Sequence, residues 1–135
     1  MTLKEILSKY RRIAVVGLSR DETKYSYLVS KFMQDAGYKI IPINPFAGEL
    51  LGERAYKSLD DVDVDFDIVD VFRPSEEALE VTRKAVEKGA KVIWLQEGIM
   101  NDEAERYARS KGVEFVQNKC IMKEYLKLFG EDYGR

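Results

Sequence analysis

The amino-acid sequence predicts an α/β fold: a doubly wound, five-stranded and mostly parallel sheet with helices on both faces. Five short apolar runs, rich in valine and isoleucine, are separated by segments with apolar residues at helical spacing. A glycine follows three of these helical segments, and a strand starts one or two residues after each glycine. At 135 residues, the chain is expected to be a single domain over 1–135 with a real core.

The predicted elements alternate along the chain in the order of successive βαβ units. The strands are expected at residues 13–17, 38–43, 66–72, 91–95 and 113–116. The helices are expected at 2–9, 27–35, 76–88, 102–111 and 123–129. Ser26 and Ser75 fit the N-caps of the second and third helices, and the glycines that end helices are Gly37, Gly89 and Gly112. The connection over 44–64 reads as irregular, with one short helical piece at 58–62.

Composition excludes several classes of function. The chain has no histidine, so a Ser-His-Asp triad, a Cys-His dyad and a histidine-ligated metal are impossible. Its single cysteine excludes an internal disulfide and favours a reducing, cytoplasmic setting. A net charge of -2 gives no footprint for nucleic acid, and no apolar run reaches the length of a membrane span. The richness in lysine and glutamate is weakly indicative of a thermophilic source.

The most informative motif is the turn after the first predicted strand. Gly17 ends the strand and a helix opens near Ser26, so backbone N–H groups and the helix dipole there favour an anion. Gly17 allows a ligand to approach the backbone closely, and Ser19 can donate its hydroxyl to a phosphate. The simpler interpretation is that Gly17 only makes a tight turn between the strand and the helix. The turn lacks the glycines of G-x-G-x-x-G, and the second strand ends at Asn44-Pro45 without the acid that holds a ribose. Both departures argue against NAD.

The other strand ends offer polar side chains at the same expected edge of the sheet. Arg73 follows the third strand and can pair with a phosphate or stack on a base, unless it is only a surface arginine. Gln96 and Glu97 end the fourth strand, while Trp94 reads as core. Cys120 follows the fifth strand and reads as a small buried hydrophobe, with a mixed disulfide as the alternative. The acidic run over 60–67 reads as a solvated lead-in to the third strand.

These loop motifs together resemble the small CoA-binding protein family, whose single domain is similar to the CoA-binding domain of the succinyl-CoA synthetase alpha subunit. The resemblance runs from about Arg12 to about Tyr125. It rests on the order and spacing of the motifs Ala14-Val15-Val16-Gly17-Leu18-Ser19, Pro42-Ile43-Asn44-Pro45, Asp67-Ile68-Val69-Asp70-Val71-Phe72-Arg73, Trp94-Leu95-Gln96-Glu97-Gly98 and Lys119-Cys120-Ile121.

The resemblance implies a Rossmann-like domain that binds coenzyme A. The implied cofactor-binding residues are Gly17, Leu18, Ser19, Lys24, Ser26, Tyr27, Asn44, Pro45, Val71, Phe72, Arg73, Gln96 and Gly98. Gly17 and Ser19 would meet the phosphates, and Gln96 and Gly98 would follow the pantetheine. Phe46 and Ala47 stand where the family often has a basic residue, so Lys24 or Arg20 would have to supply the charge for a 3′-phosphate.

We therefore expect a small-molecule binding module rather than an enzyme, with no catalytic residue and no metal. The ligand would be free, disulfide-linked or acyl-CoA, held in a carrier or regulatory role. The alternative is a nucleotide-dependent enzyme, either an NAD(P) oxidoreductase or a CoA-group transferase, with Glu97 or Tyr27 as its general base. Neither nucleic acid nor membrane is expected as a partner, and a homodimer is left open.

Overall fold

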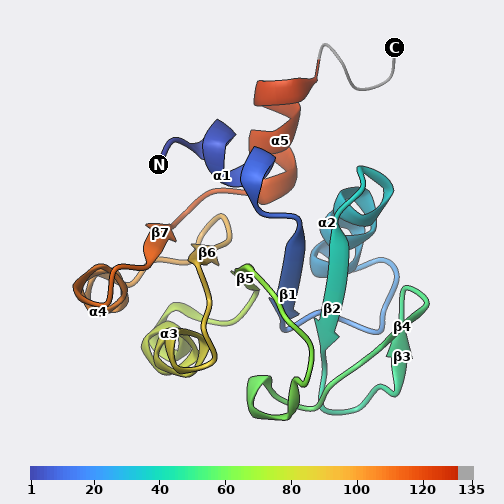
Figure 1. Cartoon of the computed structure of the whole chain (residues 1–135). Coiled ribbons are helices and arrows are strands. Elements are labelled where there is room, and N and C mark those ends of the chain that lie inside the picture. Colours follow the sequence, from blue (N-terminus) through green and yellow to red (C-terminus); the bar gives the residue numbers. More distant parts are fainter. Residues whose placement is uncertain (131–135) are drawn as a thin grey trace.

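Five parallel strands form one sheet in the computed structural model, which describes residues 1–130 (Figure 1). Across the sheet the strands are β2 (Lys39–Ile43), β1 (Arg12–Val16), β5 (Ile68–Val71), β6 (Val92–Leu95) and β7 (Glu114–Val116). Every neighbouring pair runs parallel. The predicted fold class is confirmed, and each predicted strand is present with its ends shifted by at most two residues.

Helices cover both faces of this sheet, and the strands alternate their side chains between two cores. The helices are α1 (Leu3–Lys9), α2 (Tyr25–Asp35), α3 (Ala78–Glu87), α4 (Asp102–Ser110) and α5 (Ile121–Phe129). On one face, α1, α2 and α5 pack on Ile13, Val15 and Trp94. On the other face, α3 and α4 pack on Ala14, Val69 and Ile93 (Figure 1). Two covered faces explain why the strands lack a polar alternation.

The helix ends agree with the sequence in some places and differ in others. Gly37, Gly89 and Gly112 all have positive φ, which confirms their predicted role as left-handed helix ends. The two predicted serine caps are wrong. Lys24 is the N-cap of α2, which places Ser26 inside its first turn. Ser75 opens a short 3₁₀ helix, η2 (Ser75–Glu77), and its hydroxyl accepts from the Met100 N–H instead of capping α3.

The irregular connection between β2 and β5 folds back along the sheet. It contains a two-residue hairpin, β3 (Glu49–Leu50) with β4 (Glu53–Arg54), and the 3₁₀ helix η1 (Leu59–Asp61). The hairpin was not predicted, while η1 confirms the short helical piece expected at 58–62. An isolated parallel bridge pairs Ile43 with Tyr56, so the residues after Tyr56 lie beside the carboxyl end of β2.

The strand order fixes where a ligand crevice can lie. The chain passes from β1 outward to β2 on one side and from β5 outward to β6 and β7 on the other. The order reverses between β1 and β5, and in open α/β sheets ligands bind outside the carboxyl ends of the strands at such a point. No helix within residues 1–130 is long and apolar enough to span a membrane.

Candidate functional site

Gly17 lies at the carboxyl end of β1, where the loops after β1 and β5 touch. Its φ is +89°, a conformation that favours glycine. A Cβ atom there would lie 2.7 Å from the Phe72 carbonyl oxygen. The Phe72 N–H donates to the Val16 carbonyl oxygen at 2.9 Å, which extends the pairing of the two strands by one residue. The backbone at this turn therefore has no room for a side chain.

A pocket of about 380 Å³ opens beside this glycine, between the carboxyl ends of β1 and β2 and the helix α3. Three residues of the predicted site line it, namely Gly17, Pro45 and Arg73. The sequence analysis missed others that complete the walls: Phe46, Lys57, Ser58, Leu59, Glu77, Val81 and Lys84. An apolar floor with cations at its rim can hold a base and a phosphate together.

The missed residues have two different origins. Lys57, Ser58 and Leu59 reach the pocket because the bridge from Tyr56 to Ile43 carries them to β2. No local sequence pattern predicts the pairing of Tyr56 with Ile43. Glu77, Val81 and Lys84 follow Arg73 at intervals of four, four and three residues, the spacing that keeps side chains on one side of a helical segment. That spacing could have identified them.

Ser19 and Ser26 close the β1–α2 loop by hydrogen bonds to each other and to its backbone. The Ser19 N–H donates to Ser26 Oγ at 3.0 Å, and Ser19 Oγ accepts from the Asp21 N–H at 3.0 Å. Leu18, which precedes Ser19, has a fully buried side chain in the core. The Ser19 amide is therefore already used within the loop, while its hydroxyl proton remains able to donate to an anion.

Asn44 joins the two loops that flank the crevice. Its Nδ2 donates to the Leu18 carbonyl oxygen at 2.9 Å, and its Oδ1 accepts from the Phe46 N–H at 2.7 Å. Both ends of the amide are thus engaged with backbone, and the side chain positions the loops. Pro45, the next residue, is exposed and faces the pocket.

The residues after β5 divide between the core and the pocket. Val71 is fully buried, and Phe72 is half-buried against the core on the α2 face. Arg73 is the exposed member, and its Nη2 atom lies 3.1 and 3.0 Å from the two carboxylate oxygens of Glu77. Only Arg73 of these three presents a charged side chain to the pocket.

Asp70 and Gln96 form a buried polar pair at the carboxyl ends of β5 and β6. Gln96 Nε2 donates to Asp70 Oδ1, and both side chains are 2% exposed. Burial raises the pKa of Asp70 to about 7, against the opposing effect of the Gln96 hydrogen bond. Gln96 therefore contacts the interior of the sheet, and its Oε1 has no hydrogen-bond partner among the residues described.

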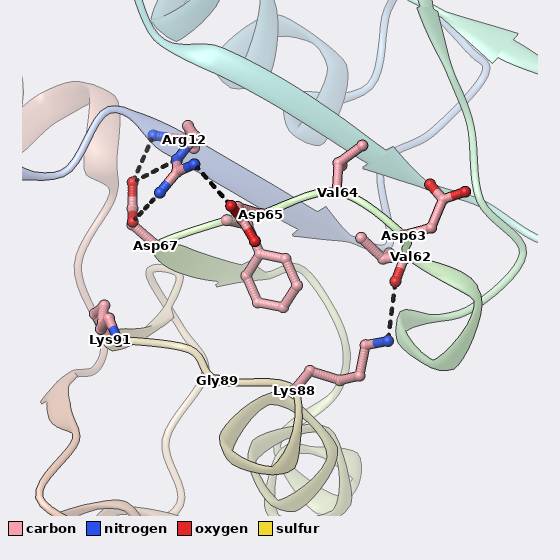
Figure 2. Close-up of a pocket in the computed structure, with 10 residues that line it drawn as sticks. Arg12, Val62, Asp63, Val64, Asp65, Asp67, Lys88, Gly89 and Lys91 are labelled. Atoms are coloured by element: carbon pink, nitrogen blue, oxygen red, sulfur yellow. Dashed lines mark hydrogen bonds and ion pairs between the residues drawn. The ribbon is translucent and has the colours of Figure 1, made fainter.

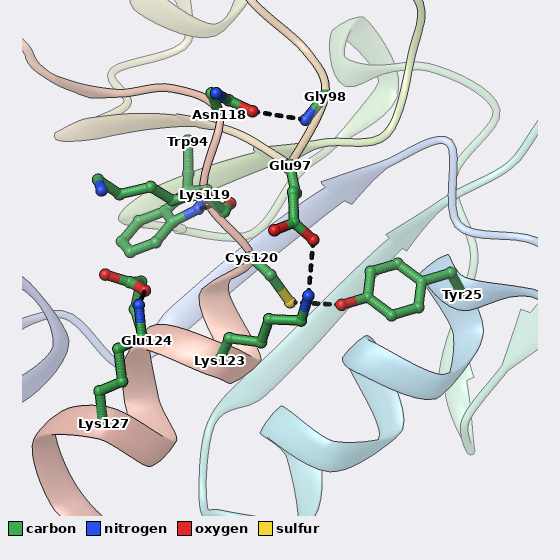
Figure 3. Close-up of polar contacts among 10 residues, drawn as sticks. All are labelled: Tyr25, Trp94, Glu97, Gly98, Asn118, Lys119, Cys120, Lys123, Glu124 and Lys127. Atoms are coloured by element: carbon green, nitrogen blue, oxygen red, sulfur yellow. Dashed lines mark hydrogen bonds and ion pairs between the residues drawn. The ribbon is translucent and has the colours of Figure 1, made fainter.

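Cys120 lies under Tyr25 at the far end of the same edge (Figure 3). The Tyr25 hydroxyl donates to Cys120 Sγ at 2.9 Å, and the thiol is 2% exposed. Burial and this hydrogen bond raise the pKa of Tyr25. An ion pair of 2.8 Å between Lys123 and Glu97 lies beside them, and Asn118 Oδ1 accepts from the Gly98 N–H at 2.8 Å. The buried-hydrophobe reading of Cys120 agrees with this geometry.

Removal of the Tyr25 ring should make the thiol reactive. We expect Tyr25→Ala to react severalfold faster than the wild type with a colorimetric disulfide reagent, because the ring and its hydrogen bond cover the sulfur. Tyr107→Ala, in α4, controls for loss of a tyrosine elsewhere. Equal rates in Tyr25→Ala and the wild type would mean that the main-chain packing, rather than Tyr25, protects Cys120.

Lys24 and Tyr27, two more of the predicted site residues, also lie outside the pocket lining. Lys24 is exposed at the N-cap of α2, and the half-buried Tyr27 packs against the core on that face. Neither lines the pocket beside Gly17. Trp94 is fully buried, which confirms its reading as core, and its Nε1 donates to the Lys119 carbonyl oxygen at 2.8 Å.

A second hollow of about 490 Å³ lies at the opposite, amino edge of the sheet (Figure 2). Arg12 forms ion pairs there with two carboxylates, Asp67 at 3.0 Å and Asp65 at 3.7 Å. Lys88 donates to the Val62 carbonyl oxygen at 2.9 Å. The hollow is lined by the acidic segment whose carboxylates are largely exposed, as predicted, and it lies away from the strand ends where ligands bind.

Comparisons with known proteins agree on one family of domains. Residues 11–125 match the family model described as a CoA binding domain. The chain is 47% identical over 119 residues to an uncharacterized protein, YneT, of Bacillus subtilis, covering 88% of each. A hypothetical protein from Pyrococcus horikoshii OT3 has a similar structure, with a TM-score of 0.90, 36% identity, and coverage of 95% of this chain and 90% of that one.

A longer relative carries a similar segment as one part. The chain is 34% identical over 85 residues to an ADP-forming acetate–CoA ligase of Methanocaldococcus jannaschii. The match spans 63% of this chain and only 12% of the ligase. The similarity therefore concerns one region of that ligase.

Proposed function

The chain belongs to the CoA-binding domain family, and from this membership we propose that it binds coenzyme A in the pocket beside Gly17 without chemical turnover. The observation that carries the proposal is the position of that pocket. It lies at the reversal of strand order, the glycine turn after β1 forms one side, and cations line its rim.

The lining suits the nucleotide end of such a ligand. Ile43, Leu59 and Val81 supply apolar surface for the adenine ring, and Arg73 supplies a guanidinium for a phosphate. The second strand ends at Asn44 instead of an acid, so the ribose contact that typifies NAD sites is missing. These features favour CoA over a nicotinamide cofactor.

The proposal of binding without turnover rests on the residues available. The chain has no histidine, so it cannot form the phosphohistidine that the resemblance to succinyl-CoA synthetase would suggest. The general-base candidates named from the sequence are Glu97, paired with Lys123, and Tyr27, half-buried against the core, and neither lines the pocket. A panel of acyl-CoA thioesters tests this directly, since release of free thiol would contradict a binding role.

Calorimetric titration of the full chain tests the proposal. We expect heat of binding with CoA and none with NAD at the same concentrations. Tight binding of NAD with no response to CoA would overturn it. Native mass spectrometry of the protein as purified adds two readings, the mass of any retained ligand and the number of copies of the chain in the assembly.

Loss of the Arg73 guanidinium should weaken CoA binding. We expect Arg73→Ala to lower the affinity by about tenfold, the value of one charge-assisted hydrogen bond to a phosphate. Glu77→Gln provides the matched comparison, because it leaves Arg73 in place but removes its carboxylate partner. That variant should bind at least as tightly as the wild type. An unchanged affinity in Arg73→Ala would make Arg73 a surface residue without a role in binding.

A further inference from the structure

Two lysines lie on the walls of the pocket. Lys57 precedes η1 and Lys84 belongs to α3, and both line the pocket. Within residues 1–130, Lys57 makes no hydrogen bond or ion pair. Lys84 Nζ lies 3.7 Å from Asp60 and 3.9 Å from Glu80, whose carboxylates are both well exposed. Lys57 is therefore unpaired among the described residues, whereas Lys84 has two ion pairs with exposed carboxylates.

The charges of the pocket are unevenly balanced. Three cationic side chains and one carboxylate line it. Arg73 is paired with that carboxylate, Glu77, at 3.0 Å, so the charge of this pair is largely offset. Within the lining, Lys57 and Lys84 are the cations without a carboxylate partner, because the two partners of Lys84, Asp60 and Glu80, lie outside the lining. In addition to Arg73, which the proposed function assigns to one phosphate, the pocket therefore has two positive charges that can bind a second anionic group.

We infer that Lys57 and Lys84 bind a second phosphate of the ligand, a terminal phosphomonoester separate from the phosphate that Arg73 meets. This inference rests on the proposed function, in which that group is the 3′-phosphate of CoA. A phosphomonoester carries nearly two negative charges at pH 7 and has three acceptor oxygens. Lysine meets such a group as a compact point charge with three donors.

The cations expected from the sequence are less well placed. Lys24 does not line the pocket. Arg20 does not line it either. Its guanidinium lies 6.0 Å from the centre of the Phe46 ring and donates to the Phe46 carbonyl oxygen at 3.5 Å. Lys57 and Lys84 would thus supply the positive charge that is missing at Phe46 and Ala47, from other segments of the chain.

Titration with CoA and with dephospho-CoA, which lacks only the 3′-phosphate, tests the inference. We expect the wild type to prefer CoA by about tenfold or more. Lys57→Ala/Lys84→Ala should lose most of this preference while its affinity for dephospho-CoA stays near the wild-type value. Lys9→Ala/Lys111→Ala removes two exposed lysines elsewhere and should keep the preference.

The outcomes separate the inference from the proposed function. If the wild type binds both nucleotides equally, or the double variant keeps its preference, the lysines do not read the phosphate, although CoA binding stands. If the wild type binds neither nucleotide, the proposed function fails as well. Should the double variant unfold, the single variant Lys57→Ala gives the same test, because Lys57 is exposed and has no partner to lose among the described residues.

Discussion

Gly17→Ala is expected to lower the free energy of unfolding by about 3 kcal/mol, through left-handed backbone strain together with a steric clash. The φ of +89° disfavours any Cβ atom, and the new methyl carbon would lie 2.7 Å from the Phe72 carbonyl oxygen and 3.1 Å from Arg73 Cδ. Relief of the clash would have to separate the loops after β1 and β5. We therefore expect CoA binding to fall sharply under conditions where the variant remains folded.

Chemical denaturation followed by circular dichroism measures this effect, and Gly89→Ala is the matched control. Gly89 has nearly the same φ, +91°, but no atom lies within 4 Å of the Cβ that alanine would add. Its substitution should cost only the backbone strain, about 1 kcal/mol. Equal losses of stability in the two variants would contradict this prediction. They would mean that the Phe72 carbonyl group moves away from the added methyl group without a measurable cost in free energy.

Asp70→Asn is expected to stabilise the protein at pH 8 and to leave it nearly unchanged near pH 4. Burial raises the pKa of Asp70 from 3.8 to about 7, so the folded chain holds this proton over a range in which the unfolded chain has released it. The free energy of unfolding therefore falls as the pH rises from about 4 to about 7, by on the order of 4 kcal/mol in total. Asparagine removes this titration and can still accept from Gln96 Nε2.

Denaturant titrations of the variant and the wild type between pH 4 and pH 8 measure the difference in their free energies of unfolding. The contributions of the other carboxylates are the same in both proteins and cancel in this difference. The difference should grow with pH and level off above pH 7. Glu22→Gln controls for loss of a charge, because Glu22 is exposed. This variant provides the baseline for the comparison. A flat difference for Asp70→Asn would mean that Asp70 is already ionised in the folded protein at low pH.

The fold could be predicted from the sequence because its signals are local. Valine-rich strands covered on both faces, and the glycines at positions 37, 89 and 112, depend on a few neighbouring residues. The errors occur where a side chain has two possible partners. Ser26 and Ser75 are good capping residues, but Ser26 accepts from the Ser19 N–H and Ser75 from the Met100 N–H. Those partners come from the packing of loops.

The candidate site divides in the same way. Gly17, Pro45 and Arg73 follow strands, so the rule of strand ends identifies them. Lys57 depends on the pairing of Tyr56 with Ile43, which brings together residues of the chain that share no local pattern. The buried pair of Asp70 and Gln96 is equally invisible, because an aspartate within an apolar strand does not reveal which side chain it meets.

The two hydrogen bonds of Asn44 have a consequence for how the crevice receives a ligand. They tie the turn after β1 to the turn after β2 in the protein without ligand. A molecule that enters between these turns meets walls with a fixed shape, and the entropy of ordering them has already been lost during folding. Association should then be limited by diffusion and orientation rather than by rearrangement of the protein, so its rate should depend linearly on ligand concentration.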